Sequence, residues 1–193
     1  MFTHDWSTVL AESLLALWPA PPQGPMRCLE VGSFEGRGSL KIVSHLCGVQ
    51  GSLLYCVDPW DDVYVAGQTH PLDGAFAGQY ARFTHNTAGE ERIVALRGTL
   101  SDFAEKLRSE GELDFAYVDG DHSEQGAYAD AALAWSLLRP GGVLLFDDYC
   151  PSWGVYEAVR RFRADTGAQV ALENGTQIAF RKPGEDQVDA QTQ

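Results

Sequence analysis

Basic residues are scarce in this sequence, and their scarcity limits the partners it can have. The 193 residues include 14 Lys and Arg against 27 Asp and Glu, which gives a formal net charge of −13 at pH 7 and a pI of about 4.6. A chain with this excess of negative charge is repelled by phosphate backbones and by anionic lipid surfaces. We therefore expect no nucleic-acid partner and no membrane surface as partner.

Long apolar runs and targeting signals are also missing. No run reaches the length of a membrane span, and the segment from Met1 to Trp18 lacks the basic start and the cleavage pattern of a signal peptide. The Cys-x-x-Cys spacing of zinc and redox sites is absent, although the chain has four cysteines (Cys28, Cys47, Cys56 and Cys150). These absences predict a cytoplasmic protein with reduced cysteines.

The sequence does contain a regular alternation of short apolar runs and longer amphipathic stretches, which predicts alternating strands and helices. Strands are expected at residues 28–31, 53–57, 92–96, 115–118, 143–146, 169–172 and 177–180. One helix is expected after the turn at residues 32–37 that follows the first strand, and it should end near residue 47. Further helices are expected at residues 74–86, 101–109, 123–138 and 155–166. Repeated strand–helix units form a sheet covered on both faces. We therefore predict an α/β fold: a doubly wound, mostly parallel, seven-stranded Rossmann-like sheet with a C-terminal antiparallel hairpin.

The length of the chain suits one domain with short extensions. Residues 1–24 are expected to form an amphipathic helix, from about Ser7 to Trp18, and a proline-rich connector. Residues 25–183 carry the alternating pattern and are expected to form the sheet and its helices. Residues 184–193 are polar and aperiodic, which predicts a flexible tail.

A glycine-containing turn follows the first predicted strand. Its glycines are Gly32, Gly36 and Gly38, and this spacing departs from the Gly-x-Gly-x-x-Gly of dinucleotide-binding folds. Glycines let the backbone turn sharply and approach a ligand, and the following helix directs free N–H groups at it. Glu30, two residues before the first glycine, suits a ligand with a cationic ammonium, such as S-adenosylmethionine. The alternative is an ordinary turn in which Glu30 is solvated.

A second signal lies at the end of the next predicted strand. Asp58 is placed to accept hydrogen bonds from both hydroxyls of a ribose. The alternative is that Asp58 starts a turn before Pro59.

Carboxylates gather after two later strands. Asp119, Asp121 and His122 follow one apolar run, and Asp147 and Asp148 follow the next. Parallel strands would bring these carboxylates to one edge, where they repel one another unless a cation or shared protons compensate. Oxygen ligands favour Mg²⁺, or alternatively Mn²⁺ or Ca²⁺, over zinc. The alternative is a pair of polar turns, with Asp147 or Asp148 capping the next segment of the chain.

These motifs, in this order, resemble those of the class I S-adenosylmethionine-dependent methyltransferases. The resemblance is greatest to a metal-dependent subgroup that includes macrocin-type and other sugar O-methyltransferases and cephalosporin hydroxylase-like proteins. The segments that carry the resemblance are Glu30–Gly36, Asp58–Trp60, Tyr117–His122, Leu138–Gly142 and Phe146–Tyr149. The present sequence is shorter than many members, and we expect it to lack the longer N-terminal elements and insertions that shape their acceptor pockets.

The resemblance implies a role for each motif. It implies that the cofactor is surrounded by Glu30, Gly32, Ser33, Phe34, Gly36, Asp58, Gly98, Thr99 and Asp119. It implies that the metal is held by Asp119, Asp147 and Asp148. It also implies that Asp121 or His122 is the general base.

The sequence therefore predicts an S-adenosylmethionine-dependent O-methyltransferase, assisted by Mg²⁺, that acts on a hydroxyl of a small molecule or sugar. A vicinal diol or catechol suits such a site because its two oxygens can chelate the metal. Metal-independent transfer and a non-catalytic cofactor-binding protein are the alternatives, and the glycine spacing disfavours a nicotinamide-dependent oxidoreductase. A homo-oligomer is left open. Aromatic residues in or beside two predicted loops can wall an acceptor pocket or simply pack (Trp60, Tyr64, His70, Tyr149 and Trp153).

Overall fold

The apolar runs form one seven-stranded sheet in the residues that the computed structural model describes, which are 2–3, 5, 7–60 and 78–184. The strands are β1 (Arg27–Val31), β2 (Leu53–Asp58), β3 (Ile93–Arg97), β4 (Leu113–Val118), β5 (Leu138–Phe146), β6 (Gln169–Asn174) and β7 (Gln177–Arg181). The helices are α1 (Thr8–Leu17), α2 (Arg37–Leu46), α3 (Gln79–Asn86), α4 (Leu100–Glu110), α5 (Glu124–Leu137) and α6 (Gly154–Thr166). Residues 185–193 of the predicted tail and the predicted helical residues 74–77 lie outside the described residues.

The sheet is wound in two directions from its middle. Its strand order is β3-β2-β1-β4-β5-β7-β6, and the strands from β3 to β5 are parallel. Only β7 among the described strands runs against its neighbours, β5 and β6. The predicted doubly wound sheet with a C-terminal antiparallel hairpin is confirmed. The chain leaves β1 toward β3 and then returns to β4, so the strand order switches between β1 and β4.

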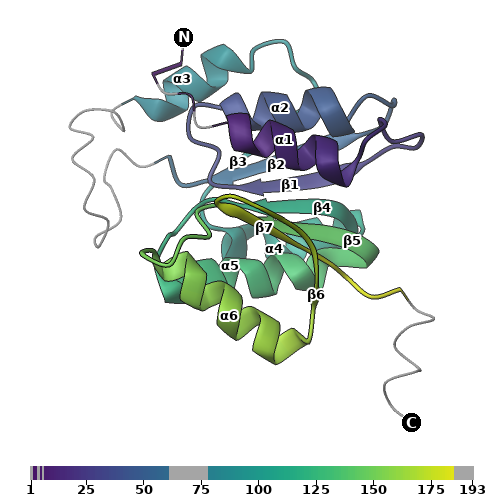
Figure 1. Ribbon diagram of the computed structural model, residues 1–193. Coiled ribbons are helices and arrows are strands. Elements are labelled where there is room, and N and C mark those ends of the chain that lie inside the picture. The colour runs from purple at the N-terminus through teal and green to yellow at the C-terminus, as the bar shows by residue number, and fades with distance from the viewer. Residues whose placement is uncertain (1, 4, 6, 61–77, 185–193) are drawn as a thin grey trace.

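Helices cover both faces of the sheet, with α1, α2 and α3 on one side and α4, α5 and α6 on the other (Figure 1). The strand residues alternate between two cores: Cys28 and Cys56 face the first three helices, whereas Leu29 and Val57 face the other three. On α5, alanines at helical spacing let the helix approach the sheet closely (Ala127, Ala131 and Ala134). Full burial of a leucine or phenylalanine side chain stabilises such a fold by about 1.5–3 kcal/mol.

The start of β5 differs from the sequence prediction. The sequence predicts a turn at residues 139–142, but β5 already begins at Leu138, which pairs with Leu113 of β4. The pairing then shifts register before Val143 meets Phe115. Gly141, with φ of +78°, supplies the backbone conformation for this irregularity. The predicted turn chemistry is therefore accommodated inside the strand.

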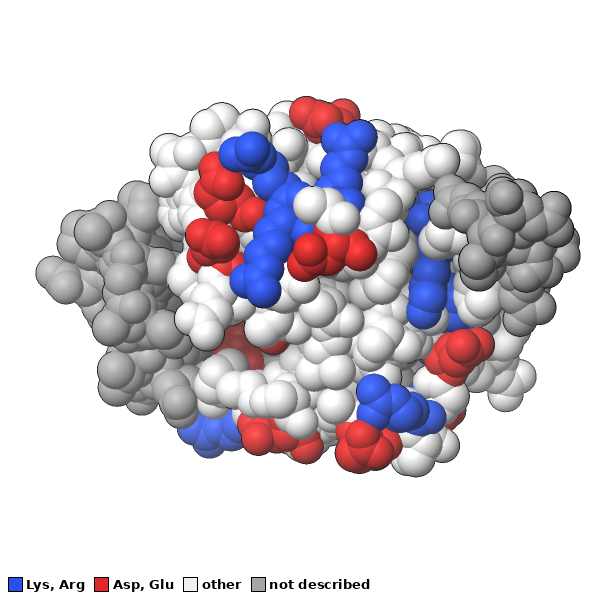
Figure 2. Space-filling view, turned by 90° about the horizontal axis from the view of Figure 1, so that it is seen from below, with Lys and Arg blue, Asp and Glu red and all other residues white. Residues whose placement is uncertain are grey.

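The face formed by α4, α5 and α6 carries charges of both signs. Lys and Arg lie beside Asp and Glu there (Figure 2), and several form ion pairs along one helix, such as Arg108–Glu105 on α4 and Arg160–Glu157 on α6. Exposed pairs of this kind contribute little to stability. None of the described helices has the length and apolar character needed to cross a membrane.

Candidate active site

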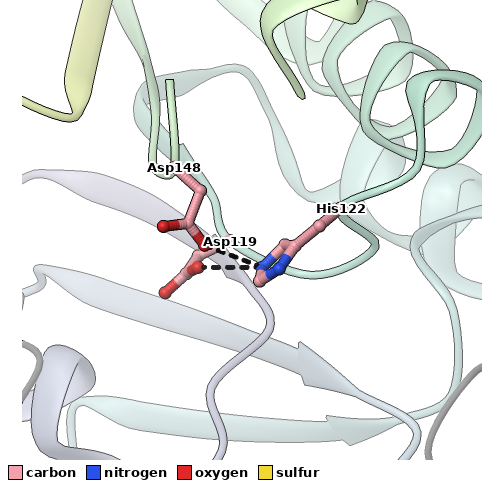
Figure 3. A group of neighbouring side chains, drawn as sticks. All are labelled: Asp119, His122 and Asp148. Carbon is pink, nitrogen blue, oxygen red and sulfur yellow. Dashed lines mark ion pairs between the residues drawn. The ribbon is translucent and has the colours of Figure 1, made fainter. Parts of the chain in front are cut away.

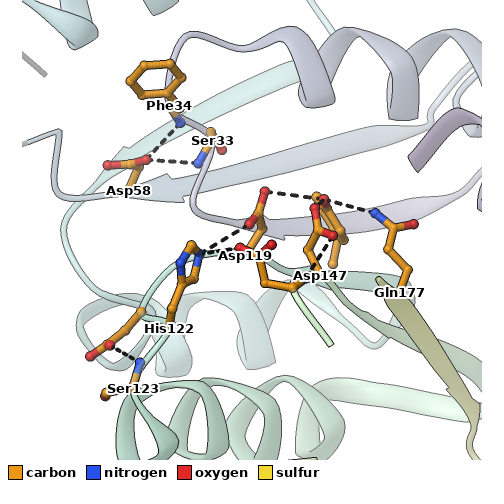
Figure 4. A network of polar contacts seen from close by, with 11 residues as sticks. Ser33, Phe34, Asp58, Asp119, His122, Ser123, Asp147 and Gln177 are labelled. Atoms are coloured by element: carbon orange, nitrogen blue, oxygen red, sulfur yellow. Dashed lines mark hydrogen bonds and ion pairs between the residues drawn. The ribbon is translucent and has the colours of Figure 1, made fainter. Parts of the chain in front are cut away.

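The carboxyl ends of the parallel strands meet at one edge of the sheet, where the strand order switches between β1 and β4. Ligands bind at such an edge in doubly wound sheets. The hydrogen-bond ladder continues one residue beyond two of the strands, because the Asp119 N–H donates to Val31 O and the Asp147 N–H to Val118 O. The chain therefore holds Asp119 and Asp147, together with Asp58 at the end of β2, at the same edge (Figure 4).

The glycine turn packs tightly against this edge. Gly32 has a φ of +86°, and a Cβ on it would lie 2.1 Å from the carbonyl oxygen of Asp119. No other residue fits there without moving the end of β4. Gly36 (φ +83°) ends the turn, and a Cβ on it would lie 2.8 Å from Thr87.

Asp58 fixes the same turn by hydrogen bonds. Its Oδ2 accepts from the backbone N–H groups of Ser33 and Phe34, both at 2.9 Å (Figure 4). Its Oδ1 accepts from the N–H of Trp60 at 2.6 Å. The structure thus places three predicted cofactor residues together, and it shows Asp58 holding the turn in shape. The predicted contact of Asp58 with a ribose stays a prediction.

Glu30 is buried beneath the glycine turn, with 1% of its surface exposed. Its carboxylate accepts hydrogen bonds from the hydroxyl of Ser39 on α2 and, at 3.4 Å, from the thiol of Cys56. Gly38 makes room for it, since a Cβ there would lie 2.7 Å from Glu30 Oε1. Burial raises the pKa of Glu30 to about 7, although the hydrogen bond from Ser39 opposes this. The alternative of a solvated turn residue is therefore wrong.

A small cavity of about 60 Å³ lies beside the turn. It is lined by the N-terminal segment, the turn and the end of β4 (Phe2, Ser7, Leu10, Glu30, Gly32, Ser33, Phe34, Glu35, Arg37, Gly38, Tyr117 and Asp119). The N-terminal segment is tied to the turn, because the N–H and hydroxyl of Thr3 donate to Glu35 and Asp5 pairs with Arg37 at 2.8 Å. Pockets that hold a small-molecule ligand usually exceed about 300 Å³, so this cavity is smaller than a typical ligand pocket.

Three side chains converge on the other half of the edge: Asp119, His122 and Asp148 (Figure 3). The Nε2 of His122 lies 3.3 Å from Asp148 Oδ2 and 3.6 Å from Asp119 Oδ1. One donor atom from each residue lies within 4.8 Å of the other two. Asp148 adopts a φ of +51°, which is uncommon for a residue other than glycine. The group formed by Asp119, His122 and Asp148 is a candidate metal site.

The electrostatics of this cluster are unfavourable in the absence of a cation. Burial, and then repulsion by Asp147, raise the pKa of Asp119, while His122 opposes the shift. Burial also raises the pKa of Asp148. For His122 burial disfavours the imidazolium, but the carboxylates of Asp119, Asp148 and Asp147 outweigh it, so that its pKa lies above the ordinary value. Both ring nitrogens of His122 are shielded from solvent and form no well-aligned hydrogen bond within the described chain.

Asp147 points to a different partner from its neighbour Asp148. Its Oδ2 accepts a hydrogen bond of 2.5 Å from the hydroxyl of Tyr117, and its Oδ1 accepts from the Asp148 N–H at 2.9 Å. The sequence predicts Asp119, Asp147 and Asp148 as ligands; the structure groups Asp119 and Asp148 with His122 and links Asp147 to Tyr117. Sequence reasoning missed Tyr117 as a site residue, although its place two residues before Asp119 puts both on one face of β4.

The remaining predicted residues lie around these two groups. Asp121 accepts from the Ser123 N–H at 2.8 Å, at the start of α5. The Gly98 N–H donates to Asp58 O, and Thr99 forms a capping box with Asp102 at the start of α4. Asp121 and Thr99 thus stabilise the starts of helices.

The aromatic residues divide between packing and the site. Trp60 is 1% exposed, donates from Nε1 to Phe34 O and packs on the ring of Phe83 at 4.6 Å, so it supports the turn from within the core. Trp153 lies edge-on to His122, with ring centroids 5.1 Å apart. Tyr149 stacks on Tyr156 of α6. Tyr64 and His70 lie outside the described residues.

Solved structures share this fold, among them two O-methyltransferases. The O-methyltransferase from Bacillus cereus, in complex with SAH, is 18% identical with a TM-score of 0.62, over 93% of this chain and 84% of that chain. The O-methyltransferase TomG from Streptomyces achromogenes, in complex with SAM, is 20% identical with a TM-score of 0.59, over 90% of this chain and 78% of that chain.

Sequence comparison supplies the family. The uncharacterised protein R132 of Acanthamoeba polyphaga mimivirus is 28% identical over 152 residues, which cover 72% of this chain and 60% of the mimivirus protein. The chain therefore spans less than two thirds of that relative. Residues 29–149, more than half of the chain, match the family described as a methyltransferase domain. The chain thus belongs to this methyltransferase family, and it has the class I S-adenosylmethionine-dependent fold that its sequence resembles.

Proposed function

We propose that the protein transfers the methyl group of S-adenosylmethionine to a hydroxyl of a small molecule or sugar, and that a divalent cation, Mg²⁺ in the first place, assists the transfer. The observation that carries the proposal is the convergence of Asp119, His122 and Asp148 beside the glycine turn. Both structural neighbours are named as O-methyltransferases.

The residues at this edge fit a hard cation. Carboxylate oxygens are the ligands that Mg²⁺ and Mn²⁺ prefer, and two of them face each other across His122. A cation there would relieve the repulsion that raises the pKa values of Asp119 and Asp148. We assign Asp119 and Asp148 as ligands, with Asp147 as the third. Mn²⁺ and Ca²⁺ have the same ligand preference and are alternatives.

The cofactor half of the site is assigned to the glycine turn. Glu30, Gly32, Ser33, Phe34 and Gly36 would bind the amino-acid end of S-adenosylmethionine, with Glu30 near its ammonium. Asp58, Gly98 and Thr99 would flank the nucleoside, because they lie together at the ends of β2 and β3. The sulfonium would then lie near Asp119, at the junction of the two halves. S-adenosylmethionine supplies an electrophilic methyl group when it is bound.

Proton removal is assigned to His122. A divalent cation supplies a lowered pKa for a coordinated hydroxyl and holds two neighbouring oxygens, which suits a vicinal diol or a catechol. With a cation on Asp119 and Asp148, His122 would be neutral and would accept the hydroxyl proton at Nε2, an atom that forms no well-aligned hydrogen bond in the described chain. Asp121 is the weaker candidate, because its carboxylate already accepts from Ser123.

Calorimetry with Mg²⁺ and Mn²⁺ tests the metal part of the proposal. The protein saturated with S-adenosylhomocysteine should bind one ion, and Asp148→Asn should weaken this binding at least tenfold. The cofactor affinity should change little. Asp165→Asn is the matched control, because Asp165 on α6 is a half-exposed carboxylate that accepts from Tyr128. The metal-assisted mechanism is excluded if wild type takes up no ion, and metal-independent transfer then replaces it.

A further inference from the structure

One buried hydroxyl joins the two carboxylates that close β4 and β5. Tyr117 is 2% exposed, and its hydroxyl lies 2.5 Å from Asp147 Oδ2 and 3.3 Å from Asp119 Oδ2. The side-chain amide of Gln177, the first residue of β7, donates to the same hydroxyl at 3.4 Å (Figure 4). Polar groups from β7 and from the ends of β4 and β5 thus contact the hydroxyl oxygen of Tyr117.

We propose that Tyr117 is a positioning residue of the metal site, whose hydroxyl holds Asp147 in the orientation in which it receives a divalent cation. This inference rests on the proposed function. Neither Tyr117 nor Gln177 is assigned a contact with the ion, the cofactor or the acceptor. Their effect passes through the carboxylate of Asp147.

The register of the sheet places these groups on one face. Tyr117 pairs with Glu30 of β1 and with Leu145 of β5, so Asp147, two residues after Leu145, projects to the same side. Asp119 projects to that side as well, two residues after Tyr117. A tyrosine ring is long enough to bring its hydroxyl from β4 to the end of β5, and the hydrogen bond of 2.5 Å shows that it does.

The contact fixes Oδ2 of Asp147, a side chain whose Oδ1 accepts from the Asp148 N–H. Hydrogen bonds to ligating carboxylates set their orientation, and their loss typically costs 10- to 100-fold in metal affinity. A hydroxyl has one proton, and the shorter contact assigns it to Asp147. The amide N–H of Gln177 then orients the hydroxyl from the opposite side. Gln177 is fully buried, so water does not replace it.

Removing only the hydroxyl separates positioning from packing. The ring of Tyr117 belongs to the core on the α1–α3 side, and Tyr117→Phe keeps that ring. Tyr55→Phe is a matched control, because Tyr55 is 1% exposed and its hydroxyl donates to Glu110 at 2.6 Å. Glu110 is the last residue of α4 and is not one of the proposed metal ligands. Each variant loses one hydrogen bond from a buried tyrosine to a carboxylate.

Titration of Mn²⁺ into the protein saturated with S-adenosylhomocysteine tests the inference. Tyr117→Phe should weaken Mn²⁺ binding 10- to 100-fold, while S-adenosylhomocysteine affinity changes less than about threefold. Tyr55→Phe should leave both affinities unchanged, with a comparable loss of melting temperature. Gln177→Leu, which removes the donor to the hydroxyl, should weaken Mn²⁺ binding by a smaller factor.

The possible failures are distinguishable. If wild type binds no Mn²⁺, the proposed function fails, and this inference fails with it. If wild type binds the ion and Tyr117→Phe binds it as well or better, only the positioning role is overturned. Equal weakening in Tyr117→Phe and Tyr55→Phe also overturns it, because the effect is then general destabilisation.

Discussion

The two halves of the strand-end edge differ in how completely their polar groups are satisfied. In the glycine-turn half the acidic side chains have partners within the chain: Asp58 accepts backbone N–H groups, Glu30 accepts from Ser39, and Glu35 pairs with Arg82 and Thr3. In the half formed by Asp119 and Asp148, two carboxylates face one imidazole. The first half is ordered before any ligand arrives, whereas the second retains negative charge that a cation can compensate.

This difference separates the contribution of each half to a methyl transfer. An ordered turn has a fixed backbone and reduces the conformational entropy lost when a cofactor binds. A cluster with excess negative charge gains most from a divalent ion, since burial has already removed part of its solvent. Substitutions in the glycine-turn half and at its junction with the acidic half can test how independent the two halves are.

The largest effect is expected at Gly32, where the halves touch. Gly32→Ala would place a Cβ 2.1 Å from Asp119 O at a φ of +86°. The clash and the strain together should lower the free energy of unfolding by about 3 kcal/mol or more. Gly89→Ala is the control, because Gly89 has a φ of +83° with no atom within 4 Å. Gly89→Ala should lower the free energy of unfolding by only about 1–2 kcal/mol. Urea denaturation measures both, and equal losses would contradict the close packing of the halves.

A smaller effect is expected when Asp58 loses its carboxylate. Asp58→Ala removes the acceptor of the Ser33 and Phe34 N–H groups and frees the turn. The thermal stabilisation by S-adenosylmethionine should decrease strongly, while Mn²⁺ affinity changes little. A thermal-shift assay with S-adenosylmethionine, and with NAD as the negative control, checks this. Weakened Mn²⁺ binding in this variant would show that the halves are coupled.

The smallest effect concerns pH and Glu30. Burial raises the pKa of Glu30 from 4.5 to about 7, so the folded protein binds a proton that the unfolded chain has released. The contribution of Glu30 to the free energy of unfolding is fully present below pH 4.5 and is lost as the pH rises to 7. Within this window stability should fall by up to about 1.4 kcal/mol per pH unit on account of this group.

Glu30→Gln isolates that contribution from the acidic cluster. The variant keeps the size of the side chain and cannot ionise, so its stability should fall less steeply between pH 4.5 and 7 than that of wild type. Denaturant melts at several pH values give the two slopes. Identical slopes would mean that Glu30 is ionised in the folded protein throughout this range.

Local patterns are sufficient for the fold and for the positions of the motifs. The methyltransferase family and the class I methyltransferase fold are confirmed. The reason is that apolar periodicity determines which residues can be buried, and parallel strands necessarily bring their carboxyl ends together. The placement of Asp58, Asp119 and Asp147 at one edge follows from that geometry alone.

The directions of the side chains could not be derived in the same way. Asp147 and Asp148 are neighbours in the sequence, yet one accepts from Tyr117 of β4 and the other faces His122. The register between β4 and β5 and the positive φ of Asp148 determine which of the two side chains meets Tyr117 and which meets His122. The burial of Glu30 likewise depends on Gly38 and Ser39, which belong to the helix beyond the turn.

Anomalous diffraction from a crystal grown with Mn²⁺ and S-adenosylhomocysteine tests the central claim most directly. The account predicts one strong peak at the acidic half, about 2.0–2.3 Å from carboxylate oxygens of Asp119, Asp147 and Asp148. The Nε2 of His122 should lie close to the open coordination positions, and the glycine turn should keep its hydrogen bonds to Asp58. The absence of a peak there, with S-adenosylhomocysteine bound in the other half, would contradict the assignment of a metal-assisted reaction.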